Sequence, residues 1–463
     1  MNSLKKNTLI VGFGISGMST ARHLLATGVP FDVADQNIER ATLSLQEMAT
    51  GNLDISDIKV IEDDWTAELF SRYQCLVVSP GVSSRSECFQ GARDSGVEVL
   101  GDVELFARSA KKPVIAVTGS NGKSTVVSMT GEILRAAGLK AAVIGNVGLA
   151  CLDGLNDNSV DVYVLELSSF QLETTSSLRP LVSTVLNVSE DHMDRYHGID
   201  DYAAVKRSVY RNSMIAVVNA DDSQSWSAEN NHKGVTEFST VSTDAPWSLH
   251  RLGDGTDELQ GPDDISVDTA VMNVDGSHNH SNALASMALV SALLEVADSL
   301  PVGQLSAAEL NSVFAAGLGQ FVGLPHRTQL VRRANGVSWF NDSKGTNVGA
   351  CVSAIEGLTG PVVLIAGGRG KGADFSPLGR AIEKKCRAVV LIGEDAERMS
   401  AAVSGYVPVY IEGSLTEAVE RASSLARSGD SVLLSPACAS FDMFANFEAR
   451  GDAFADEVNR LCA

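Results

Sequence analysis

The chain has 463 residues, 44% of them hydrophobic, and a formal net charge of −21, a length that allows about three domains of ~150 residues. The acidity argues against nucleic acid as a partner, because phosphate backbones bind basic faces. No apolar run reaches the ~18 residues of a membrane span, and the scattered cysteines fit a reducing cytoplasm, where we expect the protein to act as a monomer.

The first predicted strand, residues 7–13, leads into the loop Gly12-x-Gly14-x-x-Gly17 and then into a helix. This order is typical of a Rossmann-like sheet that holds a nucleotide diphosphate at a helix N-terminus. Asp35 ends the next strand, where a ribose-binding acid is expected. Read alone, the loop fits NAD or FAD as well as any other nucleotide diphosphate.

Apolar runs bounded by Gly, Pro, Asp or Ser recur along the whole chain and alternate with helical stretches, which predicts an α/β protein with three parallel sheets. A helix that leads to a new first strand at Val114 predicts a boundary near Gly101, and Gly323-Leu324-Pro325 predicts a second. The expected domains are 1–101, 102–323 and 324–463. The polar stretch 223–268 is expected to elaborate one end of the central sheet. The other predicted strands are 31–35, 75–81, 114–120, 140–146, 161–168, 182–189, 214–222, 361–368, 387–394, 407–413 and 430–437.

A second glycine loop follows the strand at 114–120 and opens a helix. Val117 stands where a Walker A loop has its first glycine, but the Gly-Lys-Ser-Thr end is intact. We predict a P-loop-like ATP site in which Lys123 meets the phosphates and the Ser124 hydroxyl is a ligand of Mg²⁺. The predicted loop residues are Gly119, Ser120, Asn121, Gly122, Lys123, Ser124 and Thr125.

Acidic groups follow the neighbouring strands. Glu166 ends a buried strand, an unfavourable place for a charge without a cation. Another strand is followed by Glu190, Asp191, His192 and Asp194. A lone histidine is usually structural, but this grouping beside a phosphate loop favours a magnesium site, with Glu166 as the stronger candidate.

Three strand ends beyond Pro325 carry further polar chemistry. Lysines at such ends predict a ligand with carboxylates. Ser440 lacks a G-x-S-x-G motif, so a carboxylate-binding or capping role is favoured over a nucleophilic one. The segments are "NDSKGTN" with Asp342, Lys344 and Thr346, "AGGRGKGADF" with Arg369 and Lys371, and "SPACASFDMFANFE" with Ser440 and Phe447.

Over its whole length the sequence resembles the Mur ligases, through "TGSNGKST", "LELSSFQLE", "DHMDRY", "HNHSNALA", "PHRTQ", "NDSKGTN" and "SPACASFDMFANFE". The resemblance implies that the N-terminal sheet holds the UDP of a substrate, the central sheet ATP and the C-terminal sheet an amino acid. It implies an ATP-dependent amide ligase of peptidoglycan precursor synthesis that adds D-glutamate to UDP-N-acetylmuramoyl-L-alanine through an acyl phosphate, releasing ADP and phosphate.

The resemblance also implies roles for single residues. The UDP-substrate site would use Ser16, Asp35, Gln36, Gly81, Asn146 and His192. ATP would further meet Asn279, Asn282, Arg327 and Asp342. D-glutamate would meet Lys344, Thr346, Lys371, Ser440 and Phe447, with Lys344 at the start of a helix and Lys371 anchoring Asp342 or the glutamate. Two Mg²⁺ ions would use Ser124, Glu166, His192 and Lys206. The catalytic set would be Lys123, Glu166, His192 and Lys206.

The residue pattern and the family resemblance give different predictions for Lys206. From the helical pattern alone it is a solvated helix residue, whereas the resemblance implies a carbamylated lysine beside Mg²⁺. The chain also departs from the family at Asn37, where a basic residue is common, and at Arg369, where some relatives carry Asp.

Three alternatives stay open at this point. A nicotinamide oxidoreductase would explain the Gly12–Gly17 loop with Asp35, but the "GKST" sequence counts against it. A P-loop switch or regulatory ATPase would not need lysines on the third sheet. A sister ligase that adds another amino acid is the closest competitor.

Overall fold

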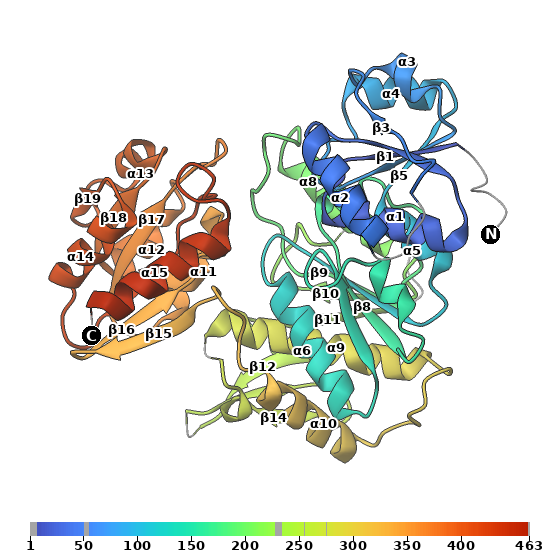
Figure 1. Ribbon diagram of the computed structural model, residues 1–463. Helices are drawn as coiled ribbons and strands as arrows, with labels where there is room; N and C mark the ends of the chain where they lie inside the picture. The colour runs from blue at the N-terminus through green and yellow to red at the C-terminus, as the bar shows by residue number, and fades with distance from the viewer. Residues whose placement is uncertain (1–6, 51–54, 227–233, 254, 275, 462–463) are drawn as a thin grey trace.

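The computed structural model describes residues 7–50, 55–226, 234–253, 255–274 and 276–461. It has the predicted three-domain α/β architecture, with one sheet in each domain (Figure 1). Within the described residues, no helix is long and apolar enough to cross a membrane.

The N-terminal sheet has five parallel strands in the order β3-β2-β1-β4-β5. The glycine loop joins β1 to α1, and Gly17 on this helix lies so close to β1 that a Cβ there would overlap the carbonyl oxygen of Gly12. The elements are β1 (Thr8–Val11), α1 (Ile15–Thr27), β2 (Phe31–Ala34), α2 (Ile38–Thr50), β3 (Val60–Ile61), α3 (Ala67–Phe70), β4 (Cys75–Val78), α4 (Glu87–Asp94) and β5 (Glu98–Leu100).

The central sheet has nine strands in the order β14-β13-β12-β11-β10-β9-β6-β8-β7. Its strands are β6 (Val114–Thr118), β7 (Ala141–Gly145), β8 (Val162–Glu166), β9 (Val182–Val185), β10 (Ile215–Asn219), β11 (Gly234–Ser239), β12 (Trp247–Arg251), β13 (Asp257–Gln260) and β14 (Ser266–Asp268). Its helices are α5 (Asp102–Ser109), α6 (Lys123–Ala136), α7 (Ser169–Leu172), α8 (Ile199–Arg207), α9 (Ser277–Val296) and α10 (Ala307–Gln320), with short 3₁₀ turns at Asp153–Asn156, Ser208–Tyr210 and Thr269–Val271.

The C-terminal sheet has six strands in the order β15-β16-β20-β17-β18-β19. They are β15 (Gln329–Ala334), β16 (Val337–Asn341), β17 (Val362–Gly367), β18 (Cys386–Ile392), β19 (Val409–Ile411) and β20 (Ser431–Leu434). The helices are α11 (Val348–Gly357), α12 (Leu378–Lys385), α13 (Ala396–Val403), α14 (Leu415–Leu425) and α15 (Phe447–Leu461).

The sheets are not parallel throughout, which corrects the sequence-based expectation. β13 and β14 pair antiparallel at one end of the central sheet, because their short connections cannot form parallel crossovers. β15 and β16 form an antiparallel hairpin closed by Asn335 and Gly336, with φ of 53° and 77°. Asn-Gly is the commonest signal of such a two-residue turn, so the hairpin was readable in the sequence.

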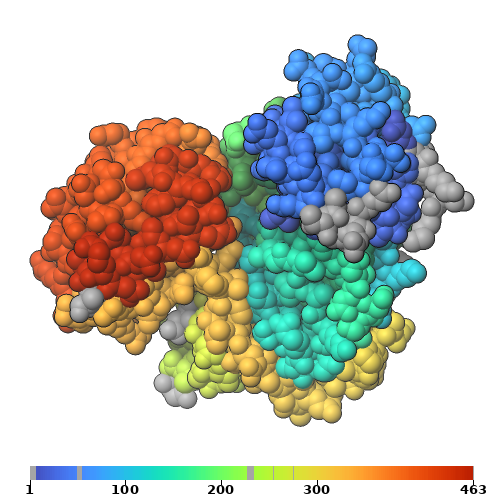
Figure 2. Space-filling model, in the orientation of Figure 1, coloured from blue at the N-terminus to red at the C-terminus, as the bar shows by residue number. Residues whose placement is uncertain are grey.

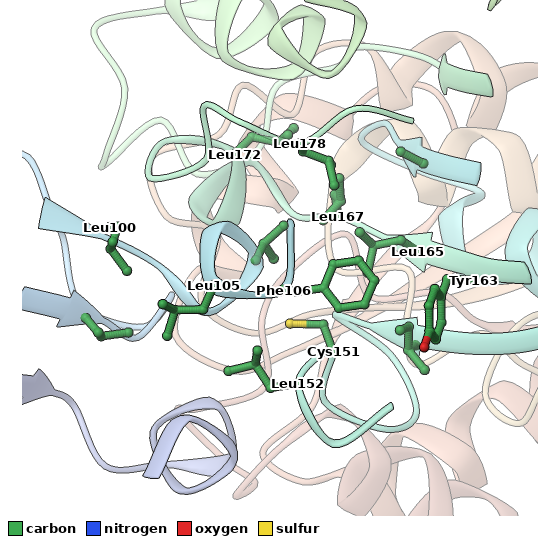
Figure 3. Close-up of a cluster of buried hydrophobic side chains, with 14 of the residues drawn as sticks. Leu100, Leu105, Phe106, Cys151, Leu152, Tyr163, Leu165, Leu167, Leu172 and Leu178 are labelled. Atoms are coloured by element: carbon green, nitrogen blue, oxygen red, sulfur yellow. The ribbon is translucent and has the colours of Figure 1, made fainter. Parts of the chain in front are cut away.

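The N-terminal and central domains share one hydrophobic cluster. Leu100 at the end of β5 and Leu105 and Phe106 on α5 belong to the same cluster as Leu165 and Tyr163 on β8 (Figure 3). Burial of apolar surface stabilises this joint without a specific geometry of polar groups. The two domains are therefore joined by a continuous core.

The C-terminal domain is joined to the central domain in a different way. Among the described residues, the clusters of the C-terminal sheet contain only residues of that domain. Its contacts across the joint include hydrogen bonds between Asn347 and Asn121 and from Arg327 to Ser124. Figure 2 shows a hollow between this domain, in orange and red, and the blue N-terminal domain. A polar joint of this kind allows the domain to move.

The contact at Gly17 gives a test of the N-terminal fold. Gly17→Ala forces a methyl group against the Gly12 carbonyl and is expected to destabilise the protein by ~1–3 kcal/mol, the usual cost of overpacking. Differential scanning calorimetry measures the shift of the unfolding midpoint. The control is Gly14→Ala, because nothing lies within 4 Å of a Cβ added there. Equal midpoints for the two variants would contradict the packing.

Candidate active site

A cavity of about 230 Å³ lies at the carboxyl ends of the central strands. Its wall contains Lys123 from the start of α6, Glu166 from the end of β8 and Lys206 from α8. His192 from the loop after β9 and Lys344 from the C-terminal domain complete this part of the wall. The structure therefore brings the four residues of the catalytic prediction to one place.

Two lysines converge on one carbonyl oxygen in this cavity. The Lys123 Nζ lies 2.7 Å and the Lys206 Nζ 2.8 Å from the oxygen of Gly119. The side chain of Lys206 is 1% exposed, so its interpretation as a solvated helix residue was wrong. Burial lowers the pKa of both lysines, and their mutual repulsion lowers the pKa of Lys206 further. Because α8 turns this residue inward, only the tertiary structure reveals its burial.

Glu166 is the buried carboxylate of the cavity, with 1% exposure. Its Oε1 accepts a hydrogen bond from Asn146 Nδ2 at 2.8 Å, while its Oε2 is buried without a partner. An unpaired carboxylate oxygen at this depth is costly unless a cation or donor reaches it, which fits a site for a cation.

The donor set for that cation is sparse. In the parts of the chain that the structure describes, no three His, Cys, Asp or Glu side chains gather as metal ligands. Mg²⁺ commonly binds to one or two carboxylates together with water and substrate phosphates. Glu166 therefore fits a Mg²⁺ ion that is completed by water and a bound nucleotide, and His192 lines the same cavity.

A second cavity, of about 160 Å³, lies between the glycine loop and the C-terminal domain. A Cβ at Gly122 (φ 82°) would lie 2.6 Å from Asn282 Oδ1, so only glycine allows this close approach. Arg327 donates to the Ser124 hydroxyl at 2.8 Å. The predicted ATP residues in its wall are Asn121, Gly122, Thr125, Asn279, Asn282, Arg327 and Asp342. Ser120 and Lys123 line the first cavity instead.

Asp342 is held firmly in this wall. Its Oδ2 accepts from the Ser435 hydroxyl at 2.6 Å and its Oδ1 from the backbone N–H of Thr328 at 3.0 Å. Burial raises the pKa of Asp342 to about 6. The carboxylate is thus oriented by the C-terminal sheet before any ligand arrives.

Lys344 lines both cavities but does not begin a helix, which corrects the prediction. Helix α11 starts at Val348 and is capped by Asn347, whose side chain accepts from the N–H of Ala350. Lys344 lies in the turn before it, with Nζ 3.8 Å from the centre of the Phe447 ring. Burial, with Arg327 and Lys123 nearby, lowers the pKa of Lys344 to about 8. The helix dipole does not act on it as the sequence suggested.

The other predicted amino-acid ligands are only partly brought together. Thr346 lines the first cavity and, with Lys371, a small neighbouring pocket. Lys371 lies 4.0 Å from Asp191 Oδ1, whereas Asp342 is bound by Ser435 and Thr328, so the suggested anchor on Asp342 is not formed. Ser440 is buried and does not line these cavities.

The largest of the cavities described, about 710 Å³, lies at the carboxyl ends of the N-terminal strands, where open α/β sheets bind ligands. Asp35 accepts from the backbone N–H of Phe13 at 2.6 Å, which fixes the glycine loop. Asn146 lines both this cavity and the one with Glu166, so the two spaces meet there. Of these two cavities, His192 lines only the one with Glu166, so it is absent from the wall of the predicted UDP-substrate site. The predicted residues in the wall are Ser16, Asp35, Gln36, Gly81 and Asn146.

The sequence interpretation missed two residues that organise the site. Asn347 exchanges hydrogen bonds with Asn121 of the glycine loop, at 3.0 and 3.3 Å. Its capping role was readable, because Asn is a favoured N-cap, but its partner was not. Arg450 is 1% exposed and donates to Ser343 and to the carbonyl of Cys438, joining the loops after β16 and β20. No local signal marks it as buried.

Comparison with protein families agrees with this architecture. Residues 6–101 match the Mur ligase MurD-like N-terminal domain, residues 117–290 the Mur ligase middle domain, and residues 326–438 the Mur ligase glutamate ligase domain. The chain belongs to the Mur ligase family.

Relatives within the family are similar from end to end. The UDP-N-acetylmuramoylalanine--D-glutamate ligase of Pseudomonas putida is 43% identical over 98% of this chain and 97% of its own length. The enzyme of the same name from Nitrosococcus oceani is 43% identical over 98% of this chain and 96% of its own length.

Solved structures share the fold at much lower identity. The UDP-N-acetylmuramate-alanine ligase of Thermotoga maritima has a TM-score of 0.58 and 18% identity, covering 98% of this chain and all of its own. A pseudomurein peptide ligase type C from Methanothermus fervidus has a TM-score of 0.62 and 15% identity, with coverage of 98% and 100%. These likenesses concern the fold alone.

The depressed pKa of Lys344 predicts a pH-dependent stability. The folded pKa of about 8 lies below the unfolded value of ~10.4, so between these values the unfolded chain binds the extra proton. Lowering the pH through this window should therefore destabilise the wild type relative to Lys344→Met. Calorimetric midpoints at pH 7.5 to 10.5 measure the difference, with exposed Lys384→Met as the control. A constant difference between wild type and Lys344→Met would contradict the assigned pKa.

Proposed function

We propose that this chain is a ligase that joins D-glutamate to UDP-N-acetylmuramoyl-L-alanine at the expense of ATP. The observation that carries the proposal is the end-to-end similarity to enzymes of that name, at 43% identity over 98% of the chain. The arrangement of the cavities supports it, because Asn146 lines both the cavity of the N-terminal sheet and the one with Glu166, while Arg327 and Lys344 line both that one and the cavity beside the glycine loop.

The proposed division of labour follows the domains. Residues 1–101 bind the UDP substrate, 102–323 bind ATP and 324–463 bind the amino acid. The uridine diphosphate lies along the glycine loop of the largest cavity, where α1 presents its N-terminus. The muramoyl-alanine arm then passes Asn146 into the cavity with Glu166 and His192.

ATP occupies the cavity between the central and C-terminal domains. Asn279 and Asn282 face the adenine end, Asp342 the ribose, and Lys123 and Arg327 the phosphates. Lys123 and Arg327 stabilise the charge of the transferring phosphoryl group. Mg²⁺ ions bound by Ser124, Glu166, His192 and Lys206 would neutralise phosphate charge.

Carbamylation of Lys206 is part of this proposal. The reaction with CO₂ needs a neutral amine, and burial beside Lys123 lowers the pKa of Lys206 well below its ordinary value. The carbamate would turn a cation into an anionic oxygen ligand. It would thereby add a carboxylate-like donor to Glu166, at a site where no three described His, Cys, Asp or Glu side chains gather.

The chemistry has two steps. The alanine carboxylate attacks the γ-phosphate of ATP, which gives an acyl phosphate and ADP. The amine of D-glutamate then attacks the acyl carbon, and inorganic phosphate leaves. Lys344, Thr346 and Lys371 hold the two glutamate carboxylates, with Ser440 and Phe447 joining as the domain closes. Closure also keeps water from the acyl phosphate.

ATP and UDP-linked substrates are supplied in the cytoplasm, so we place the protein there. The scattered cysteines of the sequence, with no C-x-x-C pair, agree with a reducing compartment. We also propose that the protein acts as a monomer.

Release of phosphate tests the function. With ATP, Mg²⁺ and UDP-N-acetylmuramoyl-L-alanine present, D-glutamate should support phosphate release, and L-glutamate, L-lysine and meso-diaminopimelate should not. Omitting the UDP substrate is the control for idle ATP hydrolysis. Preference for another amino acid would contradict the assignment of D-glutamate.

Substitution of Glu166 tests the cation site. Glu166→Gln keeps the shape and the contact to Asn146 but removes the charge of the unpaired oxygen, so half-maximal activity should require at least about tenfold more Mg²⁺, since charged hydrogen-bonded partners contribute ~1.5–3 kcal/mol. Glu132→Gln, on the outer surface of α6, is the matched control. An unchanged Mg²⁺ titration for Glu166→Gln would show that this carboxylate does not bind the metal.

A further inference from the structure

Arg195 connects the largest cavity to the cavity that holds His192. It lies in the loop after β9, where its backbone N–H donates to the carbonyl of His192 at 2.9 Å. Its side chain is only 10% exposed. A buried guanidinium three residues from His192 needs partners that explain its position.

On one side, the guanidinium binds the loop that follows β4. Nη1 donates to the carbonyl of Pro80 at 3.1 Å and Nη2 to that of Val82 at 3.4 Å. Pro80, Gly81 and Val82 all line the largest cavity. Nη2 also binds Glu173 Oε2 at 2.5 Å, so a residue of the central domain holds the guanidinium in its orientation.

On the other side, the guanidinium stacks on an aromatic ring. Its central carbon lies 4.0 Å from the centre of the Phe170 ring. The same ring contacts the imidazole of His192, with centres 4.7 Å apart at an angle of 64°. Loop, guanidinium, ring and imidazole therefore form one continuous series of contacts.

We propose that Arg195 is a positioning residue that couples occupancy of the largest cavity to the orientation of His192. A ligand that contacts Gly81 shifts or fixes the carbonyls on either side of it. The guanidinium is planar, and it is held by these carbonyl groups on one side and by the Phe170 ring on the other. It therefore transmits a change in the loop to Phe170 and His192. The inference rests on the proposed function for the identity of the ligand, a UDP-linked muramoyl compound.

Arg85 provides a matched control within the same boundary. It also binds Glu173, at 3.1 Å, and forms two hydrogen bonds with Asp201 at 2.6 and 3.1 Å. Its guanidinium lies over Tyr196, however, and its side chain is 30% exposed. Loss of Arg85 therefore removes ion pairs between the domains without removing the contacts to Pro80, Val82 and Phe170.

The experiment follows the His192 imidazole by NMR in ¹⁵N-histidine-labelled protein, with His192→Gln to assign the signal. UDP-N-acetylmuramoyl-L-alanine should shift this signal in the wild type and in Arg85→Met. Arg195→Met should lose the shift and bind the compound about tenfold more weakly by calorimetry, because the loop that carries Gly81 is no longer held in place before the ligand binds. Arg195→Lys, which keeps the charge but not the fork, should recover part of the shift.

A full shift in Arg195→Met, or none in the wild type when the compound is bound, would overturn the coupling and leave the proposed function intact. Absence of binding to the wild type would overturn both. Circular dichroism confirms that the variants are folded, and Arg195→Lys provides the test if Arg195→Met is not.

Discussion

The carbonyl oxygen of Gly119 accepts hydrogen bonds from two lysine side chains, Lys123 and Lys206. Arg327 and Lys344 line the same cavity, while Glu166 is the buried carboxylate among them. Burial away from water lowers the pKa values of the three lysines, and repulsion by neighbouring cations lowers them further. The cavity is therefore prepared for polyanions, and its ligands complete its charge balance.

The two joints between the domains suit the binding of ligands at this site. The N-terminal and central domains share a hydrophobic core, so the cavity for the UDP substrate keeps a fixed relation to the glycine loop. The C-terminal domain carries Lys344 and Thr346 on a joint of hydrogen bonds such as Asn121–Asn347. Polar contacts exchange with water at small net cost. The amino-acid side of the site can thus open for ligands and close for chemistry.

Much of this organisation was predictable because it depends on local patterns. Both glycine loops, Glu166 at its strand end and the three sheets follow from short segments whose geometry is set by neighbours in sequence. The burial of Lys206 was not predictable in this way. The first turn of its helix carries Asp200 and Asp201, which suggests an exposed helix, and its hydrogen bond is to Gly119, far away in the sequence. Lys344 was misplaced for a different reason: Asn347 is a favoured N-cap and starts the helix at Val348, and this local signal was overlooked. Arg195 and Arg450 act through carbonyl groups of distant loops, which leave no periodic signal.

The most direct test of the excess positive charge is the number of protons taken up when nucleotide binds. At pH 8 part of the Lys344 population is neutral, because its pKa is about 8, and a bound polyanion should raise that pKa. Titration calorimetry with a Mg²⁺-bound, non-hydrolysable ATP analogue, in two buffers of different ionisation enthalpy, measures the uptake. Net proton uptake in the wild type, reduced in Lys344→Met, is the predicted result. No uptake, or proton release, would contradict a cavity whose cations await an anionic ligand.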